Sequence, residues 1–210
     1  MNVESNMNAL VLFSGGLDST TSLAIAKSKG YNITALTINY KQRHDYEIIA
    51  SKKILSNYPD IKHIVFDIDL TKIGGSALTD SDLDVPTEES FGIPITYVPA
   101  RNTIFLSIAA SYAEKLKIKD IFIGVNAIDY SGYPDCRPEF IASFEKMINI
   151  GTKSGSEGSP FRILTPLINM TKSEIINTGT KLGVDYSATV SCYSLSNRGE
   201  ACGNCDSCKF

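Results

Sequence analysis

The order of apolar and helical segments along the chain is the feature that most narrows its fold. Short runs rich in β-branched and other apolar residues predict strands at 9–13, 33–39, 61–67, 121–124 and 161–164. Segments with helical spacing alternate with them, at 18–28, 46–55, 102–116, 138–150 and 171–182. This alternation is typical of a parallel sheet covered by helices on both faces. We therefore predict an α/β fold with a doubly wound parallel sheet.

Residues that typically begin or end helices support the predicted helix boundaries. Gly30 stands where a C-terminal helix cap belongs, and Thr171 with Glu174 three residues later forms a capping box. Between 70 and 99 the pattern lapses into Gly, Ser, Asp, Thr and Pro, which predicts an excursion over the active-site edge. The composition of 151–159 predicts a mobile linker. We divide the chain into a main domain, 8–182, and a C-terminal lobe, 183–210.

Composition excludes several classes of protein. With 43% hydrophobic and 20% charged residues, the 210-residue chain can bury a core, so disorder is not expected. No apolar run approaches the roughly 20 residues that cross a bilayer, and no secretory signal opens the chain, so we expect a cytoplasmic protein with no membrane partner. A net charge of -3 disfavours stable nucleic-acid binding and favours small-molecule substrates.

The segment between the first strand and the first helix predicts an anion site. It reads Phe13-Ser14-Gly15-Gly16-Leu17-Asp18-Ser19-Thr20. Paired glycines let the backbone approach an anion, and the amides at a helix N-terminus supply donors. The segment lacks the Gly-Lys-Ser/Thr ending of a Walker loop and the third glycine of a dinucleotide fingerprint. Its other interpretation, a glycine turn capped by Asp18, is less favoured because the loop directly joins a strand to a helix.

Four cysteines near the chain end predict a metal site. Cys192 is followed by Cys202, Cys205 and Cys208. Disulfides are not expected in a reducing compartment, and four thiolates at this spacing suit tetrahedral Zn²⁺. An iron–sulfur cluster and a redox pair are the alternatives. A filled four-ligand site makes this metal structural, with one zinc per chain and no part in the chemical step.

A third constellation follows the fourth strand, over 124–140. Tyrosines, carboxylates and an arginine at this edge could stack on a planar heterocycle, hydrogen-bond to its edge and pair with a carboxylate. Its candidate side chains are Asp129, Tyr130, Tyr133, Asp135 and Arg137. A structural loop is the alternative interpretation.

The phosphate loop also carries a family resemblance. The string Ser14-Gly15-Gly16-Leu17-Asp18-Ser19 resembles the signature of the PP-loop ATP pyrophosphatases, which belong with the adenine nucleotide alpha hydrolase-like folds. The resemblance implies that the loop binds the pyrophosphate end of ATP and that Asp18 helps to place Mg²⁺. The residues that it implicates in ATP binding are Phe13, Ser14, Gly15, Gly16, Leu17, Asp18, Ser19, Thr20, Thr21, Ser22 and Leu23.

Three further strings narrow the resemblance. The segments 40–44, 98–102 and 129–137, together with the cysteines, resemble the family of 7-cyano-7-deazaguanine synthases of queuosine biosynthesis, over 10–208. That family converts 7-carboxy-7-deazaguanine and ammonia into the nitrile, using ATP. The chain departs from the family pattern at Ala100, where Gly is usual, and it stops at Phe210, where relatives continue.

The resemblance implies a route and assigns roles. The carboxylate is adenylated, ammonia gives the amide, and a second activation removes the amide oxygen. Asp18, Arg101 and Lys172 are the expected catalytic residues, and Asn102 joins the substrate-binding set. Lys172 could equally be a surface residue at a helix start. Cys136 is interpreted as a packed residue rather than a nucleophile, His44 as a proton acceptor or phosphate donor, and His63 as incidental.

Two rival functions remain open at this stage. A PP-loop tRNA-thiolating enzyme would need a basic face and reactive cysteines, and a zinc-ribbon nucleic-acid module could carry a nucleotide-sensing domain. The expected partners are 7-carboxy-7-deazaguanine, ammonia and ATP, with no stable nucleic acid, and we expect a homodimer. The ammonia source is expected to be free ammonia, because no glutaminase segment is present in the sequence.

Overall fold

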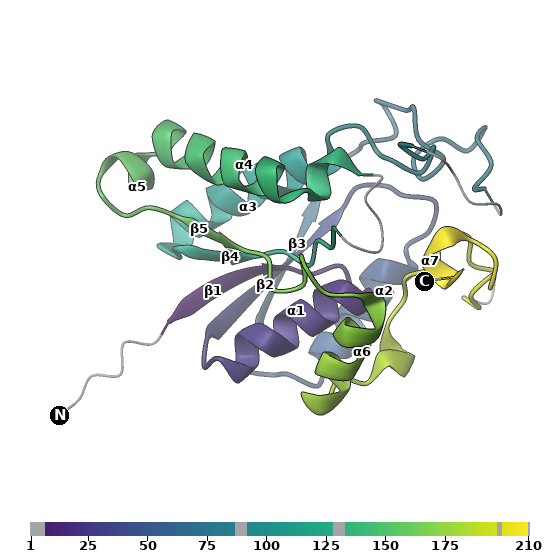
Figure 1. The fold of residues 1–210 in the computed structure, drawn as a ribbon, viewed down its shortest axis with the longest axis horizontal. Coiled ribbons are helices and arrows are strands. Elements are labelled where there is room, and N and C mark those ends of the chain that lie inside the picture. The colour runs from purple at the N-terminus through teal and green to yellow at the C-terminus, as the bar shows by residue number, and fades with distance from the viewer. Residues whose placement is uncertain (1–6, 87–91, 128–132, 197–198, 210) are drawn as a thin grey trace.

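A computed structural model describes residues 7–86, 92–127, 133–196 and 199–209 of the chain. Within this part, parallel strands form one sheet in the order β3-β2-β1-β4-β5 (Figure 1). The strands are β1 (Asn8–Leu12), β2 (Asn32–Asn39), β3 (Lys62–Asp67), β4 (Asp120–Phe122) and β5 (Arg162–Leu164). The chain builds the sheet outward from β1 in one direction and then in the other. The predicted doubly wound parallel sheet is confirmed.

Helices cover both faces of this sheet. The longer ones are α1 (Leu17–Ser28), α2 (Tyr46–Leu55), α3 (Arg101–Leu116), α4 (Pro138–Gly151) and α6 (Lys172–Lys181). The short ones are α5 (Lys153–Ser156), α7 (Asp206–Lys209) and the 3-10 turns η1 (Pro134–Cys136) and η2 (Tyr186–Ala188). Helices α3 and α4 lie on one face, and α1, α2 and α6 lie on the other (Figure 1).

The central strand shows how the sequence divides the core between the two faces. Leu10 and Leu12 belong to the apolar cluster beneath α3 and α4, whereas Ala9 and Val11 belong to the cluster beneath α1 and α2. Successive side chains of a strand point to opposite faces, so an unbroken apolar run is what a strand buried on both sides requires. The sheet therefore separates two apolar clusters, one beneath each helical layer.

Most predicted helices and strands are confirmed, and one predicted linker is wrong. Helix α6 begins with the predicted capping box, in which Thr171 accepts a hydrogen bond from the Glu174 amide and the Glu174 carboxylate accepts one from the Thr171 amide. The linker predicted over 151–159 contains α5, which a bond from the Ser154 amide to Glu114 Oε1 (2.8 Å) joins to α3. The Thr152 side chain caps this turn by accepting from the Gly155 amide, so small polar residues here build a helix rather than a free linker.

The departure at Ala100 has a backbone consequence. Ala100 is the N-cap of α3 and has a left-handed conformation, with φ 54° and ψ 26°. A residue with a Cβ pays about 1–2 kcal/mol for this conformation, which glycine adopts freely. The strain lies directly before Arg101, one of the predicted catalytic residues.

The sequence predicts no membrane-spanning helix. Among the residues that the structure describes, no helix combines the length and the apolar character that crossing a bilayer requires.

Candidate active site and cysteine cluster

The phosphate loop lies at the point where the strand order reverses. It follows the carboxyl end of β1, the strand from which the sheet grows toward β2 on one side and β4 on the other. Loops at such a position form the binding crevice of doubly wound sheets. Gly15 has φ 85°, and a Cβ there would lie 2.6 Å from the Ser51 amide nitrogen on α2. Only glycine fits this turn.

Serine hydroxyl oxygens accept hydrogen bonds from several backbone amides of the loop. The Ser14 amide donates to Ser19 Oγ (3.2 Å), and the Gly16 amide donates to Ser14 Oγ (3.2 Å). The Leu17 amide donates to Ser191 Oγ (3.1 Å), which comes from the C-terminal lobe. These hydroxyl groups surround the N-terminal end of α1, and helix N-termini commonly bind phosphate oxygens. The loop is thus built for oxygen acceptors.

Asp18 and Lys172 form an ion pair across the mouth of the loop. Lys172 Nζ lies 3.0 Å from Asp18 Oδ1 and 3.1 Å from Oδ2, with side chains 22% and 33% exposed respectively. Lys172 is the first residue of α6, and Asp18 is in the first turn of α1. The structure therefore brings together two of the predicted catalytic residues. The side chain of Lys172 is partly buried in this pair, and its catalytic role stays a prediction.

A cavity of about 270 Å³ opens beside the loop and this ion pair. The main domain lines it with the phosphate loop, the carboxyl end of β4 and the start of α3. The C-terminal lobe lines it with residues on either side of its cysteines, namely Ser191, Tyr193, Asp206 and Ser207. One end of the cavity thus carries the charges of Lys172 and Asp18. Aromatic side chains form a wall of the same cavity.

Arg101 and Tyr133 form part of that wall. Arg101 Cζ lies 5.9 Å from the centroid of the Tyr133 ring, a distance typical of a cation–π contact. The Tyr133 hydroxyl shares a 2.9 Å hydrogen bond with Thr96 Oγ1. Because a guanidinium stays protonated in proteins, Arg101 provides a permanent positive charge in the cavity.

Asp135 supports the wall from behind. The Asn102 amide donates to Asp135 Oδ2 (2.9 Å), and Asn102 Nδ2 donates to the Asp135 carbonyl (3.1 Å) and to Cys136 Sγ (3.3 Å). Burial raises the pKa of the Cys136 thiol to about 11, although the charge of Arg101 opposes the shift. At neutral pH the thiol is therefore protonated, which fits the packed residue that we expected.

Glu47 is a cavity residue that sequence reasoning missed. It lies in the first turn of α2 and lines the cavity with Arg101. Burial raises the pKa of Glu47 above its ordinary 4.5, against the lowering effects of a hydrogen bond with Gln42 and of the Arg101 charge. The sequence feature that could have identified Glu47 is its position in the first turn of a helix that follows the carboxyl end of β2.

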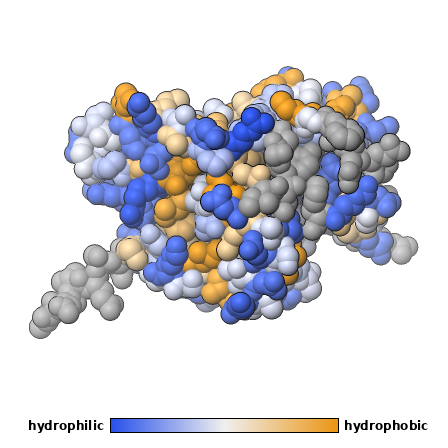
Figure 2. All heavy atoms as spheres, viewed as in Figure 1, coloured by the Kyte–Doolittle hydropathy of each residue, from blue (hydrophilic) through white to orange (hydrophobic). Residues whose placement is uncertain are grey.

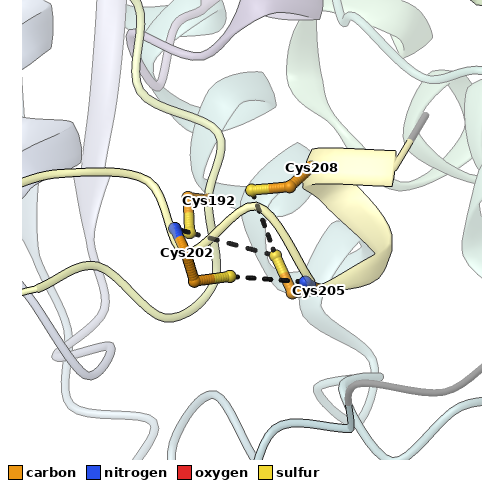
Figure 3. A group of neighbouring side chains, drawn as sticks. All are labelled: Cys192, Cys202, Cys205 and Cys208. Carbon is orange, nitrogen blue, oxygen red and sulfur yellow. Dashed lines mark hydrogen bonds between the residues drawn. The ribbon is translucent and has the colours of Figure 1, made fainter.

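The four cysteines of the lobe converge (Figure 3). One sulfur from each lies within 4.8 Å of the others. Cys205 Sγ lies 3.9 Å from Cys192 Sγ and 3.6 Å from Cys208 Sγ. Tetrahedral zinc with Zn–S bonds of roughly 2.3 Å separates its sulfurs by about 3.8 Å. The cluster can therefore hold a metal ion.

Backbone amides face the sulfurs of Cys192 and Cys202. Cys192 Sγ accepts from the amides of Ser194 (3.4 Å) and Cys202 (3.3 Å). Cys202 Sγ accepts from Asn204 (3.4 Å) and Cys205 (3.3 Å). Gly203, with φ 72°, lies in the turn between Cys202 and Cys205. Such amides stabilise thiolates, the form of cysteine that binds metals.

The structure brings most predicted residues to the cavity. Predicted residues that line it are Phe13, Ser14, Gly16, Leu17, Asp18, Ser19, Arg101, Asn102, Tyr133 and Lys172. The described lining does not include Gly15, Thr20, Thr21, Ser22, Leu23, Asp135 or Arg137. Helix α1 directs Ser22 and Leu23 into the interior, and Arg137 is exposed. Asp129 and Tyr130 lie outside the described residues.

The two histidines of the chain make different hydrogen bonds. His44 Nε2 lies 3.1 Å from the Cys192 carbonyl oxygen, so it joins the segment after β2 to the cysteine lobe. His63 Nε2 shares a 2.8 Å hydrogen bond with Thr37 Oγ1, which donates to the Phe13 carbonyl just before the loop. We interpreted His63 as incidental, and no local pattern predicted its contact with Thr37.

Comparison with known proteins places the chain among enzymes of one pathway. The family model of the queuosine biosynthesis protein QueC matches residues 8–210. A 7-cyano-7-deazaguanine synthase of Saccharophagus degradans is 58% identical over 98% of this chain and 92% of its own length. One of Cellvibrio japonicus is 57% identical over the same shares of the two chains.

Among solved structures, NMN synthetase from Francisella tularensis has a similar fold. It superposes with a TM-score of 0.53 at 17% identity, over 98% of this chain and 72% of that chain. At this identity the likeness concerns the fold alone.

Proposed function

This chain belongs to the QueC family of queuosine biosynthesis proteins, and from that membership we propose that it converts 7-carboxy-7-deazaguanine and ammonia into 7-cyano-7-deazaguanine. The chain is an ATP-dependent ligase of the kind for which its curated relatives are named. The observation that carries the proposal is the cavity itself, which joins a phosphate loop to a wall with aromatic and charged groups.

The chemistry requires two activations in one place. A carboxylate oxygen is a poor leaving group until AMP is attached, and ammonia then displaces AMP to give the amide. A second adenylation, on the amide oxygen, allows its departure as AMP and leaves the nitrile. The phosphate loop holds the departing pyrophosphate each time, because its donors meet the charge as it grows.

The described side chains divide this work. Lys172 and Arg101 neutralise the α-phosphate or the substrate carboxylate, and Asp18 takes part in placing Mg²⁺, which would screen the phosphate charges. Glu47 faces the same cavity and accepts a proton as ammonia forms the C–N bond. Its raised pKa makes this carboxylate a stronger base than an exposed glutamate. Tyr133 and Tyr193 offer aromatic surface to the deazaguanine ring, with Asn102 beside them.

The metal of the lobe is zinc, with Cys192, Cys202, Cys205 and Cys208 as its ligands. Four thiolates whose sulfurs lie within 4.8 Å of one another favour zinc over oxygen-seeking cations. Four protein ligands fill the coordination sphere, so the metal is structural. The division into a main domain, 8–182, and a zinc lobe, 183–210, follows from this role, although the lobe also lines the cavity.

The rival thiolating function gains no support from the cysteines. Four of the five are gathered in the cluster, and the fifth, Cys136, is a buried thiol with a pKa of about 11. A thiolate nucleophile would need a lowered pKa.

A homodimer without nucleic acid is the assembly that we propose. Figure 2 shows an apolar strip among hydrophilic residues on the visible face. On helix α4, Met147 and Ile150 are 52% and 71% exposed. Light scattering during gel filtration measures the oligomeric state directly, and a monomer would contradict this part of the proposal.

Mass spectrometry tests the main activity. The zinc-loaded protein is incubated with 7-carboxy-7-deazaguanine, ammonium and Mg-ATP, and we expect the mass of the nitrile together with AMP and pyrophosphate. Omission of ammonium is the matched control. An unchanged acid would refute the function, and ADP with phosphate as the only nucleotide products would refute the adenylation route.

A further inference from the structure

We infer that Ser191 is a ligand of the pyrophosphate end of ATP, supplied to the phosphate loop by the cysteine lobe. The inference rests on the proposed function, because it concerns how the same cavity holds its nucleotide. It adds a residue from the far end of the chain to the predicted binding set, which ended at Leu23.

Within the part of the chain that the structure describes, no acceptor takes the proton of the Ser191 hydroxyl. Its Oγ accepts from the Leu17 amide at 3.1 Å, which uses one lone pair. A serine hydroxyl also carries one donor hydrogen, and the accepted bond directs that hydrogen away from Leu17. Ser191 lines the cavity, so the donor is available to an oxygen bound there. An accepted amide bond also polarises the hydroxyl and makes it a better donor to an anion.

The second glycine of the loop favours the close approach of Ser191. A Cβ on Gly16 would lie 3.3 Å from Ser191 Oγ and 3.3 Å from the Val190 carbonyl oxygen, closer than ordinary contact. The Val190 amide also donates to the Gly15 carbonyl at 3.1 Å. The paired glycines therefore do two things: they admit an anion, and they admit the segment that carries Ser191.

The cysteine cluster fixes this segment. Ser191 directly precedes Cys192, and the Ser207 hydroxyl, next to Cys208, donates to the Ser191 carbonyl at 2.6 Å. His44 holds the Cys192 carbonyl from the other side at 3.1 Å. Two ligand-bearing segments thus meet at Ser191, so a filled metal site would fix the position of its hydroxyl over the loop.

Binding measurements without turnover test the inference. Titration calorimetry with Mg²⁺ present uses three probes: α,β-methylene-ATP, pyrophosphate and adenosine. For Ser191→Ala we expect the dissociation constants of the first two probes to rise about tenfold or more, since a hydrogen bond to a charged group is lost. Adenosine binding should not change. Ser194→Ala is the matched control, because Ser194 is exposed in the same lobe and its contact with Cys192 uses only its backbone amide.

Ser191→Thr keeps the hydroxyl and separates its loss from a collapse of the loop. We expect it to bind pyrophosphate much more tightly than Ser191→Ala does. Equal pyrophosphate affinity of wild type and Ser191→Ala would overturn the inference, and so would equal weakening by both substitutions. A wild-type protein that binds none of the three probes would instead refute the proposed ATP-dependent function.

Discussion

At the scale of single residues, the pairing of Lys172 with Asp18 is the contact on which the proposed chemistry most depends. The sequence left Lys172 evenly balanced between a surface role and a catalytic role, because position at a helix start is compatible with both. The distance of 3.0 Å to Asp18 and the shared cavity favour the catalytic role. Spatial proximity of residues 154 positions apart in the chain cannot be read from local pattern.

Replacement of that lysine should reduce turnover and leave the fold intact. For Lys172→Met we expect a loss in kcat of about a hundredfold or more, the effect of removing a donor aimed at developing charge. Lys181→Met is the control, since Lys181 is the exposed last residue of the same helix. Steady-state kinetics with a melting curve checks this. A lower melting temperature with unchanged kcat would assign Lys172 a structural role.

Glu47 makes a prediction about pH. Its pKa is raised above 4.5 in the folded protein, so the folded state binds this proton more tightly than the unfolded state does. Stability is therefore lost as pH rises from about 4.5 through the folded pKa. The melting temperature of Glu47→Gln, which has no such loss, should increase relative to wild type across that interval.

The control for this pH series is Glu139→Gln, an exposed first-turn glutamate of α4. Its melting temperature should follow that of the wild type at every pH. A Glu47→Gln difference that is flat, or that shrinks as pH rises, would contradict the burial of the carboxyl group. Activity should fall in the same variant, since the amide cannot accept a proton.

At the scale of elements, the start of α3 shows a limit of sequence reasoning. Residue type placed Asp135 in the substrate pocket, but its carboxylate accepts the Asn102 amide in the first turn of the helix. Ala100, just before the helix, holds a left-handed conformation. The Asp135 bond depends on how η1 packs against α3, a contact between residues that are 33 positions apart. The helices themselves were predictable, because their apolar spacing is local.

We therefore expect Asp135→Ala to act mainly on stability. Loss of the bond to a helix N-terminal amide costs about 1–2 kcal/mol, or a few degrees in melting temperature for a chain of this size. Asp45→Ala is a suitable control, because Asp45 is the N-cap of α2 but makes no side-chain capping bond. A large rise in the KM for the deazaguanine with an unchanged melting curve would restore Asp135 to the binding set.

At the scale of the whole molecule, the lobe and the main domain form one site. Local signals predicted the parallel sheet, the phosphate loop and the four clustered cysteines, since each rests on short-range spacing. They did not predict that Ser191 and Tyr193, beside Cys192, line the cavity. We expected a metal with no part in the chemical step. That expectation stays a prediction, and the cavity lining makes the shape of the site depend on the lobe.

Metal removal should therefore affect stability and binding together. Metal analysis should return about one zinc per chain for a four-ligand site. For Cys205→Ser we expect a lower melting temperature and a higher dissociation constant for pyrophosphate, because Ser191 is released with the lobe. Ser194→Ala should change neither quantity. An unchanged melting temperature with abolished turnover would make the cysteines catalytic and favour the thiolating function.

The claim that one phosphate loop performs two adenylations is the centre of this account. Substrate labelled with ¹⁸O in both carboxylate oxygens tests it, with the nucleotides analysed by mass spectrometry. Each oxygen leaves on a separate AMP if the carboxylate and then the amide are adenylated. We predict two molecules of AMP, each with one ¹⁸O, for every nitrile formed. Label recovered in inorganic phosphate, or in one AMP only, would contradict the account.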